Sequence, residues 1–217
     1  MSMEEVPHMK PARRLDQIAG PLYGWSSLHT EWKVHFNSYA LQTPDGVALI
    51  DPVRPGPAVL QKIEALGELV GVFLTNANHD RDADWFRRHY EIQVYAHEKA
   101  AAECDTKIDV PLLDNEKLPG GLKALYLPGS GAGEIGLYCR SEGGILLLGD
   151  ALLNLPKDGL ALLPEQYCED VRAARRSAKR LLTLDLKIVT FAHGTPLTDN
   201  AKRQITRFLK APRKKDQ

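Results

Sequence analysis

The sequence has no long apolar run, few cysteines and no excess of charge, and each lack excludes a class of protein. No stretch is long enough to cross a bilayer, and the charged first thirty residues predict no secretory signal. Lys and Arg number 28 and Asp and Glu number 28, so no overall field favours nucleic acid or a membrane. The three cysteines are odd in number and widely spaced, which predicts a reducing, cytoplasmic location without disulfides or a zinc–thiolate site.

A folded domain is present instead. The chain has 217 residues, of which 43% are hydrophobic, enough for one sizeable core. We expect a flexible N-terminal segment over residues 1–17, a single domain over 18–211 and a basic tail over 212–217.

Alternating apolar residues and turn signals predict strands that form hairpins early in each half of the chain and neighbour helices later. Hairpins are expected over residues 37–50 and 134–148, and helices over 57–66, 169–183 and 199–210. This order favours an α+β fold in which two sheets stack face to face with helices outside.

One stretch, residues 71–84, holds an unusual group of polar side chains. A buried strand is predicted over 72–75, a polar run follows, and a helix then begins whose apolar face includes Trp85 and Phe86. Because α/β proteins usually build sites where strands end, we expect the functional site here.

The polar run and four further landmarks, one before it and three after it, resemble the metallo-β-lactamase superfamily, which implies a four-layer αββα sandwich. That family writes Thr-His-x-His-x-Asp-His where this chain has Thr-Asn-Ala-Asn-His-Asp-Arg, so Asp80 is kept and three histidines are replaced. The other landmarks are Ile50-Asp51, Pro128-Gly129-Ser130 with Ser130 in place of a histidine, Gly149-Asp150, and Ala192-His193-Gly194.

The resemblance implies two metal positions, and most of their ligands are changed. The first would be lined by Asn76, Asn78 and Ser130, neutral groups that hold a transition metal poorly. The second would keep Asp80, Asp150 and His193, but it would also contain Arg81. Since a guanidinium has no lone pair to donate, we hypothesise that Arg81 replaces the metal by forking between Asp80 and Asp150.

Two functions follow from this resemblance. In the first, no cofactor is expected, and a degenerate pocket with Asn76, Asn78, Arg81 and Ser130 binds a small molecule or a protein partner. In the second, Asp80, Asp150 and His193 are catalytic. They then hold one zinc, manganese or iron ion in a hydrolase of an ester, thioester or phosphoester. Ligand chemistry favours the first function. Residues 23–36 and 154–166 are expected as loops around the pocket, and the sequence gives no oligomeric state.

Other interpretations of the same residues stay open. Asn76, Asn78 and Asp80 are also typical of loops and helix caps. Ser130 and His193 with a carboxylate could form a nucleophile, base and orienting group. His79 is predicted to point away from the site, unless the loop follows a different path and recruits it. The basic helices predict solvated faces, with polyanion binding as a third class of function.

Overall fold

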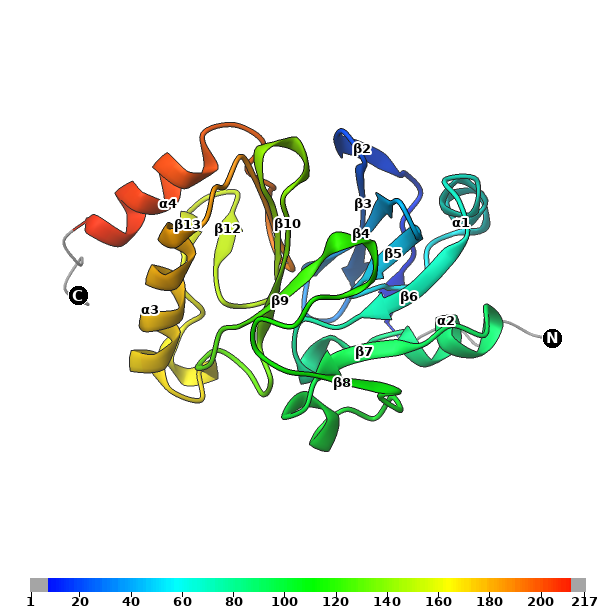
Figure 1. Cartoon of the computed structure of the whole chain (residues 1–217), viewed down its shortest axis with the longest axis horizontal. Coiled ribbons are helices and arrows are strands. Elements are labelled where there is room, and N and C mark those ends of the chain that lie inside the picture. The colour runs from blue at the N-terminus through cyan, green and yellow to red at the C-terminus, as the bar shows by residue number, and fades with distance from the viewer. Residues whose placement is uncertain (1–7, 212–217) are drawn as a thin grey trace.

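The structure, a computed structural model, describes residues 8–211 and arranges them in four layers (Figure 1). Helices α3 (Val171–Arg180) and α4 (Ala201–Lys210) cover one side, and two β-sheets face each other in the middle. Helices α1 (Pro57–Glu64) and α2 (Ala83–His89) cover the opposite side. The predicted α+β fold, a four-layer αββα sandwich, is confirmed.

Among the described residues, the first sheet has eight strands in the order β1-β3-β4-β5-β6-β7-β8, with β2 paired to β3. Its β5 and β6 run parallel, joined by α1, since a crossover between parallel strands usually contains a helix. The strands are β1 (Met9–Lys10), β2 (Asp16–Ala19), β3 (Leu22–His29), β4 (Val34–Thr43), β5 (Gly46–Ile50), β6 (Leu69–Phe73), β7 (Val94–His97) and β8 (Val110–Leu112).

The second sheet has four strands over the same described range, in the order β14-β11-β10-β9, and a separate hairpin follows β11. Its β11 and β14 run parallel, with α3 in the connection between them. The strands are β9 (Lys123–Tyr126), β10 (Ile135–Cys139), β11 (Ile145–Leu148) and β14 (Ile188–Phe191), and the hairpin is β12 (Leu153–Leu155) with β13 (Gly159–Ala161).

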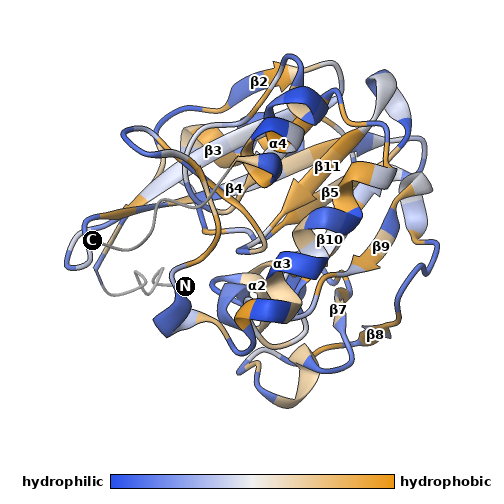
Figure 2. Cartoon of the chain, turned by 90° about the vertical axis from the view of Figure 1, so that its left-hand side faces the viewer, coloured by the Kyte–Doolittle hydropathy of each residue, from blue (hydrophilic) through white to orange (hydrophobic). Residues whose placement is uncertain are grey.

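The central strands are apolar on both faces because each face meets another layer. In β11, Ile145 and Leu147 pack between the sheets, whereas Leu146 and Leu148 pack under α3 and α4. The helices therefore need only one apolar stripe, and Figure 2 shows their polar faces turned outward. No helix among the described residues has the length and apolar character of a membrane span.

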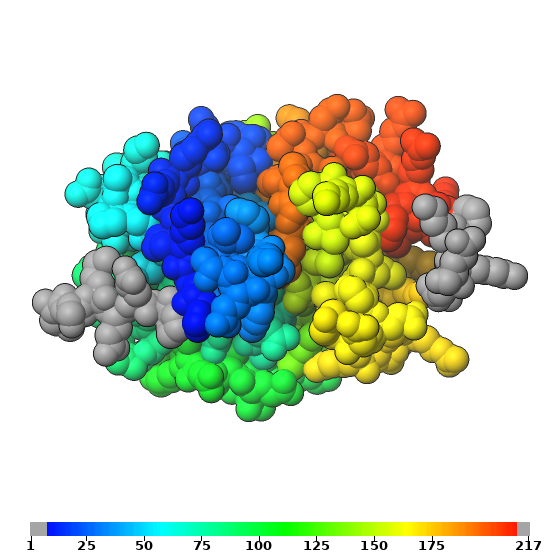
Figure 3. Space-filling model, turned by 180° about the vertical axis from the view of Figure 1, so that it is seen from behind, coloured from blue at the N-terminus to red at the C-terminus, as the bar shows by residue number. Residues whose placement is uncertain are grey.

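Several elements differ from the sequence predictions. Residues 23–36, expected as a loop, contain most of β3 and the start of β4, and the expected loop 154–166 contains most of the β12–β13 hairpin. A strand pair also begins inside the segment expected to be flexible, since β1 pairs with β3 and Ala12 is buried. Predictions for residues 1–7 and 212–217 lie outside the described residues. Figure 3 shows the two halves of the chain joined side by side in one body.

Candidate functional site

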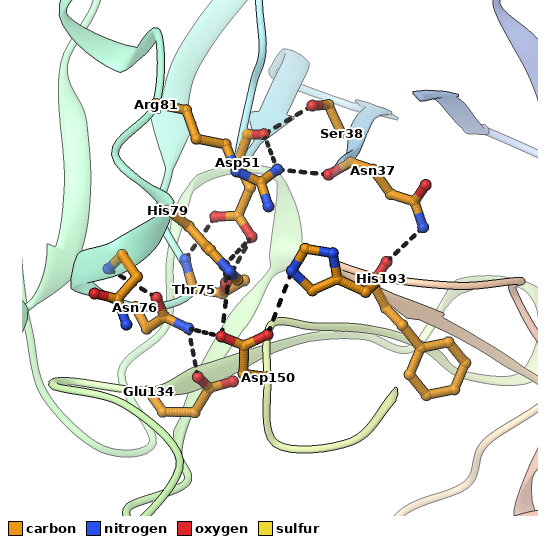
Figure 4. Close-up of polar contacts among 12 residues, drawn as sticks. Asn37, Ser38, Asp51, Thr75, Asn76, His79, Arg81, Glu134, Asp150 and His193 are labelled. Carbon is orange, nitrogen blue, oxygen red and sulfur yellow. Dashed lines mark hydrogen bonds and ion pairs between the residues drawn. The ribbon is translucent and has the colours of Figure 1, made fainter. Parts of the chain in front are cut away.

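Two pairs of parallel strands bring the polar residues to one edge of the sandwich. Ile50 of β5 pairs with Phe73 of β6, so Asp51 and Thr75 leave the first sheet close together. In the second sheet β11 and β14 end in register, so Asp150 and His193 leave at the same edge. The carboxyl ends of all four strands therefore converge on one site (Figure 4).

Asn37 of β4 connects the sheets at this edge. Its side-chain amide donates to the carbonyl oxygens of Phe191 at 3.0 Å and Gly194 at 2.7 Å. The Tyr39 hydroxyl also donates to the Phe191 carbonyl, at 2.6 Å. These bonds fix the backbone around His193, so β4 determines where that imidazole lies.

His79 lies inside the site, held by Asp51 and Thr75. Asp51 is buried and accepts from the Thr75 amide at 2.8 Å and from the Thr75 hydroxyl at 2.5 Å. The Nδ1 atom of His79 lies 3.0 Å from the Asp51 carboxylate and 2.8 Å from the Thr75 hydroxyl. Because the carboxylate only accepts, the proton belongs on Nδ1 of His79, and Nε2 is left facing Asp150 at 3.4 Å.

His193 approaches Asp150 in the same manner from the second sheet. Its Nδ1 lies 2.8 Å from the backbone oxygen of His35, an acceptor, so this nitrogen also carries the proton. Its Nε2 faces Asp150 at 3.8 Å. Oδ1 of Asp150 is buried and has no hydrogen-bond partner among the described residues. Ligand atoms of His79, Asp150 and His193 lie within 4.8 Å of one another, as in a metal site.

Asn76 and Glu134 form a second, closed pair beside Asp150. Both side chains are buried, and the Asn76 amide donates to Glu134 at 2.7 Å and to Asp150 at 3.3 Å. The other oxygen of Glu134 accepts from the Ala151 amide at 3.0 Å. Gly149 leaves the room for this pair, because a Cβ there would come within 2.8 Å of Glu134.

Burial and neighbouring charges together determine the pKa values of these groups. For Glu134, burial and the charge of Asp150 raise the pKa to about 8. For Asp150, burial raises the pKa, but the charges of His79 and His193 outweigh it, and the pKa is lowered. For His79, burial lowers the pKa, but Asp150 and Asp51 raise it to about 9 overall. In His193, burial prevails and the pKa is lowered.

The structure corrects the predicted roles of His79 and Asp80. A 3₁₀ turn over Ala77–His79 carries His79 inward, although it was predicted to point away. Asp80 points out of the site, where its carboxylate accepts from the amides of Asp105 at 3.0 Å and Thr106 at 3.4 Å. The alternative in which the loop recruits His79 is therefore the one observed, and the expected group of Asp80, Asp150 and His193 does not form.

The predicted fork of Arg81 between Asp80 and Asp150 is also wrong. Its Nη1 donates instead to the backbone oxygens of Asn37 at 2.7 Å and Asp51 at 2.9 Å. These carbonyls belong to the first sheet and hold the guanidinium on that side of the site.

The other predicted binding residues divide by burial. Asn78 is exposed, and its backbone N–H donates to the side-chain oxygen of Asn76, as at the N-terminus of a helix. Ser130 is buried, and its hydroxyl has no hydrogen-bond partner among the described residues. No hydrogen bond joins Ser130 to His193 within the described residues, so the nucleophile–base arrangement gains no geometric support.

Sequence reasoning missed three residues that build the site. Glu134 is a lone carboxylate between a glycine-rich loop and an apolar strand, a signal that could have marked it. Asn37 looked like an ordinary strand residue, and Asp51 was used only as a landmark. Nothing in the sequence shows that both contact the site, because their partners lie far away along the chain.

Comparisons with known proteins identify the family. The sequence model described as Metallo-beta-lactamase superfamily matches residues 12–209, so the chain belongs to that superfamily. No curated protein matches the chain.

Solved structures share the fold at low identity. The DIM-1 metallo-beta-lactamase is 18% identical with a TM-score of 0.75, covering 93% of this chain and 98% of its own. A metallo-beta-lactamase family protein from Thermus thermophilus is 21% identical with a TM-score of 0.67, covering 89% and 79%. The protein TTHA1623, solved in a di-iron-bound form, is 22% identical with a TM-score of 0.63, covering 75% and 89%.

The family implies metal ions, and the residues fit one ion better than two. At the first position, the Asn76 amide points hydrogen atoms, not a lone pair, at Asp150. At the second, His79 stands where Asp80 was expected. The imidazoles of His79 and His193 and the carboxylate of Asp150 are suitable metal ligands. Each ligand of an ion lies about 2 Å from it, so ligands are separated by roughly 3–4 Å. The distances of 3.4 and 3.8 Å from Asp150 to His79 and His193 agree with this spacing.

Proposed function

We propose that this protein is a hydrolase of the metallo-β-lactamase superfamily that works with a single metal ion. The ion would be held by His79, Asp150 and His193, and it would be zinc, manganese or iron. The substrate would be a small molecule with an ester, thioester or phosphoester bond. The observation that carries the proposal is the convergence of three ligand atoms within 4.8 Å, with both imidazoles already oriented.

Each residue of the site has a definite part in this proposal. Asp51 accepts the Nδ1 proton of His79, and the His35 carbonyl accepts that of His193, so both Nε2 atoms face inward. Such outer partners fix the tautomer and the orientation of ligating histidines. Because the pKa of His79 is raised to about 9, metal binding would require its Nε2 to give up a proton. A bound ion would supply a nucleophilic water at neutral pH and polarise the scissile group. The His193 side chain is 18% exposed, so substrate would approach along this residue.

Metal analysis tests the proposal directly. Protein purified without chelator or a metal column should contain about one equivalent of zinc, manganese or iron per chain. Stripping the metal should abolish hydrolysis of p-nitrophenyl esters and bis(p-nitrophenyl) phosphate, and one added equivalent should restore it. A sample that binds none of the three metals and gains no activity from any of them contradicts the proposal.

A second candidate is a metal-free binding protein, and Arg81 is the observation that favours it. This residue places a permanent cation beside the carboxylates that would otherwise attract a metal. In that case the pocket keeps its ligand and lacks hydrolysis. The same metal analysis separates the two candidates, because only the hydrolase requires a stoichiometric ion.

A further inference from the structure

Arg81 is held in place from one side only. Its backbone lies in the left-handed region, with φ at 43°, which few residues other than glycine adopt. Its Nη1 is fixed by the carbonyls of Asn37 and Asp51, and its guanidinium carbon lies 4.9 Å from the centre of the Phe36 ring. Figure 4 shows the guanidinium beside His79 and His193, above the carboxylate of Asp150.

Two other nitrogens of the guanidinium have no hydrogen-bond partner among the described residues. Nε and Nη2 of Arg81 are buried and make no hydrogen bond within residues 8–211. A buried donor without an acceptor destabilises a protein, and arginine cannot relieve the cost by losing its proton. These two nitrogens therefore need an acceptor that the described chain does not supply.

Among the described residues, no nearby carboxylate hydrogen-bonds to Arg81 through its side chain, although the charges of Asp51 and Asp150 act on it. Asp51 directs its side-chain oxygens to Thr75 and His79, and Arg81 meets only its backbone oxygen. Asp80 bonds the amides of Asp105 and Thr106. No ion pair joins Arg81 to a carboxylate among the described residues, so its charge stays available to a ligand.

We infer that Arg81 binds an anionic group of the substrate, a carboxylate or a phosphate, next to the bond that is cut. A guanidinium matches both groups because its N–H bonds form a planar fork. An anionic oxygen between Arg81 and a metal is attracted to both, so it removes the repulsion that two neighbouring cations would otherwise have. A neutral ester gains nothing from this arrangement. The cleavage rests on the proposed function, but anion binding by Arg81 does not require a metal.

A matched pair of esters tests the inference. p-Nitrophenyl succinate carries a free carboxylate, and p-nitrophenyl butyrate is a neutral analogue of the same chain length. Arg81→Met should lower kcat/KM for the succinate ester by roughly 10- to 100-fold, since hydrogen bonds to charged groups are that strong. The loss for the butyrate ester should be much smaller, so the ratio of the two kcat/KM values is the quantity that tests the inference. Arg87→Met is the matched control, because Arg87 of α2 is also partly buried and already pairs with Asp84.

Calorimetry tests binding without catalysis and separates the two anions. Succinate and inorganic phosphate are each titrated into metal-free wild-type protein, and at least one should bind and be lost in Arg81→Met. Anion binding by a protein that takes up none of the three metals contradicts the proposed hydrolase and still supports the inference. If neither anion binds and the wild type cleaves both esters equally, the inference is overturned. If Arg81→Met does not fold, Arg81→Lys keeps the charge without the fork, and the wild-type comparisons still decide.

Discussion

Two groups of side chains share Asp150, and their donors face it in different ways. In the first, Asn76 and Glu134 bond to each other and to Asp150, so hydrogen atoms occupy the space between them. In the second, His79 and His193 face Asp150 at 3.4 and 3.8 Å, separations that suit ligands sharing an ion. The difference lies in which donor can lose its proton, not in burial, since both groups are largely covered. The His79 imidazole can give up the proton that it points at Asp150, whereas the Asn76 amide cannot.

Asp150 is thus bonded by an amide on one side and faced by two imidazoles on the other. An amide that points its hydrogens at a carboxylate stabilises the negative charge by hydrogen bonds, in the place where a metal ion would otherwise do so. An imidazole whose Nδ1 proton is already bound leaves its other nitrogen to accept a metal. Asp150 belongs to both groups, so each can be changed while the other is measured.

The largest effect is expected from removing a direct ligand. His193→Ala should lower metal affinity by more than the roughly 100-fold that losing an outer-shell partner can cost, because an imidazole ligand disappears. Affinity is measured by competition with a chromophoric chelator. His35→Ala is the matched control, since it removes a neighbouring imidazole but keeps the backbone oxygen that orients His193. Stoichiometric metal in His193→Ala would place the ion elsewhere.

A smaller effect on the same position is expected from Asp51→Asn. An asparagine amide cannot accept at both of its ends, so either Thr75 or His79 loses its acceptor. Metal affinity should fall by about 10- to 100-fold, the usual cost of an outer-shell partner. Asp82→Asn serves as the control, because Asp82 is also buried but accepts from the Arg54 amide. Equal affinities in the two variants would show that Asp51 does not orient His79.

The sequence predicted the site residues of the second sheet, Asp150 and His193, better than those that follow β6 of the first sheet. Asp150 and His193 each follow a predicted strand directly, and parallel pairing carries them to one edge. The choice between His79 and Asp80 could not be predicted, because it depends on free amides at Asp105 and Thr106 that attract the carboxylate outward.

The spacing of residues along the chain also gave the wrong hydrogen-bond partner for Arg81. It suggested a carboxylate, but the backbone carbonyls of Asn37 and Asp51 accept the hydrogen bonds instead. The fold follows from periodic burial along the chain, whereas these polar contacts depend on groups that meet only after folding.

Glu134→Gln examines the closed position. Glu134 accepts at both oxygens, from Asn76 and from Ala151, and even its acid form keeps lone pairs on both. A glutamine nitrogen has none, so one buried donor loses its partner, at a cost of about 1–3 kcal/mol. Urea unfolding measures this loss, and the exposed Glu98→Gln should change stability by less than about 0.5 kcal/mol. Metal content should stay at one equivalent; a second equivalent in Glu134→Gln would mean that the hydrogen bond between Asn76 and Glu134 keeps the first position closed.

The smallest effect is expected from Asp80→Asn, which separates the observed site from the one expected from the sequence. Asparagine keeps one acceptor but loses the charge that bonds the amides of Asp105 and Thr106, so stability should fall by about 1 kcal/mol. Metal affinity should remain within roughly threefold of wild type, far below the cost of a lost ligand, because the Asp80 carboxylate points away from Asp150 and His193. Chelator competition and urea unfolding on the same samples distinguish the two effects. A loss of metal as large as that of His193→Ala would mean that the loop after Thr75 turns Asp80 inward when an ion binds, and that His79 gives way to it.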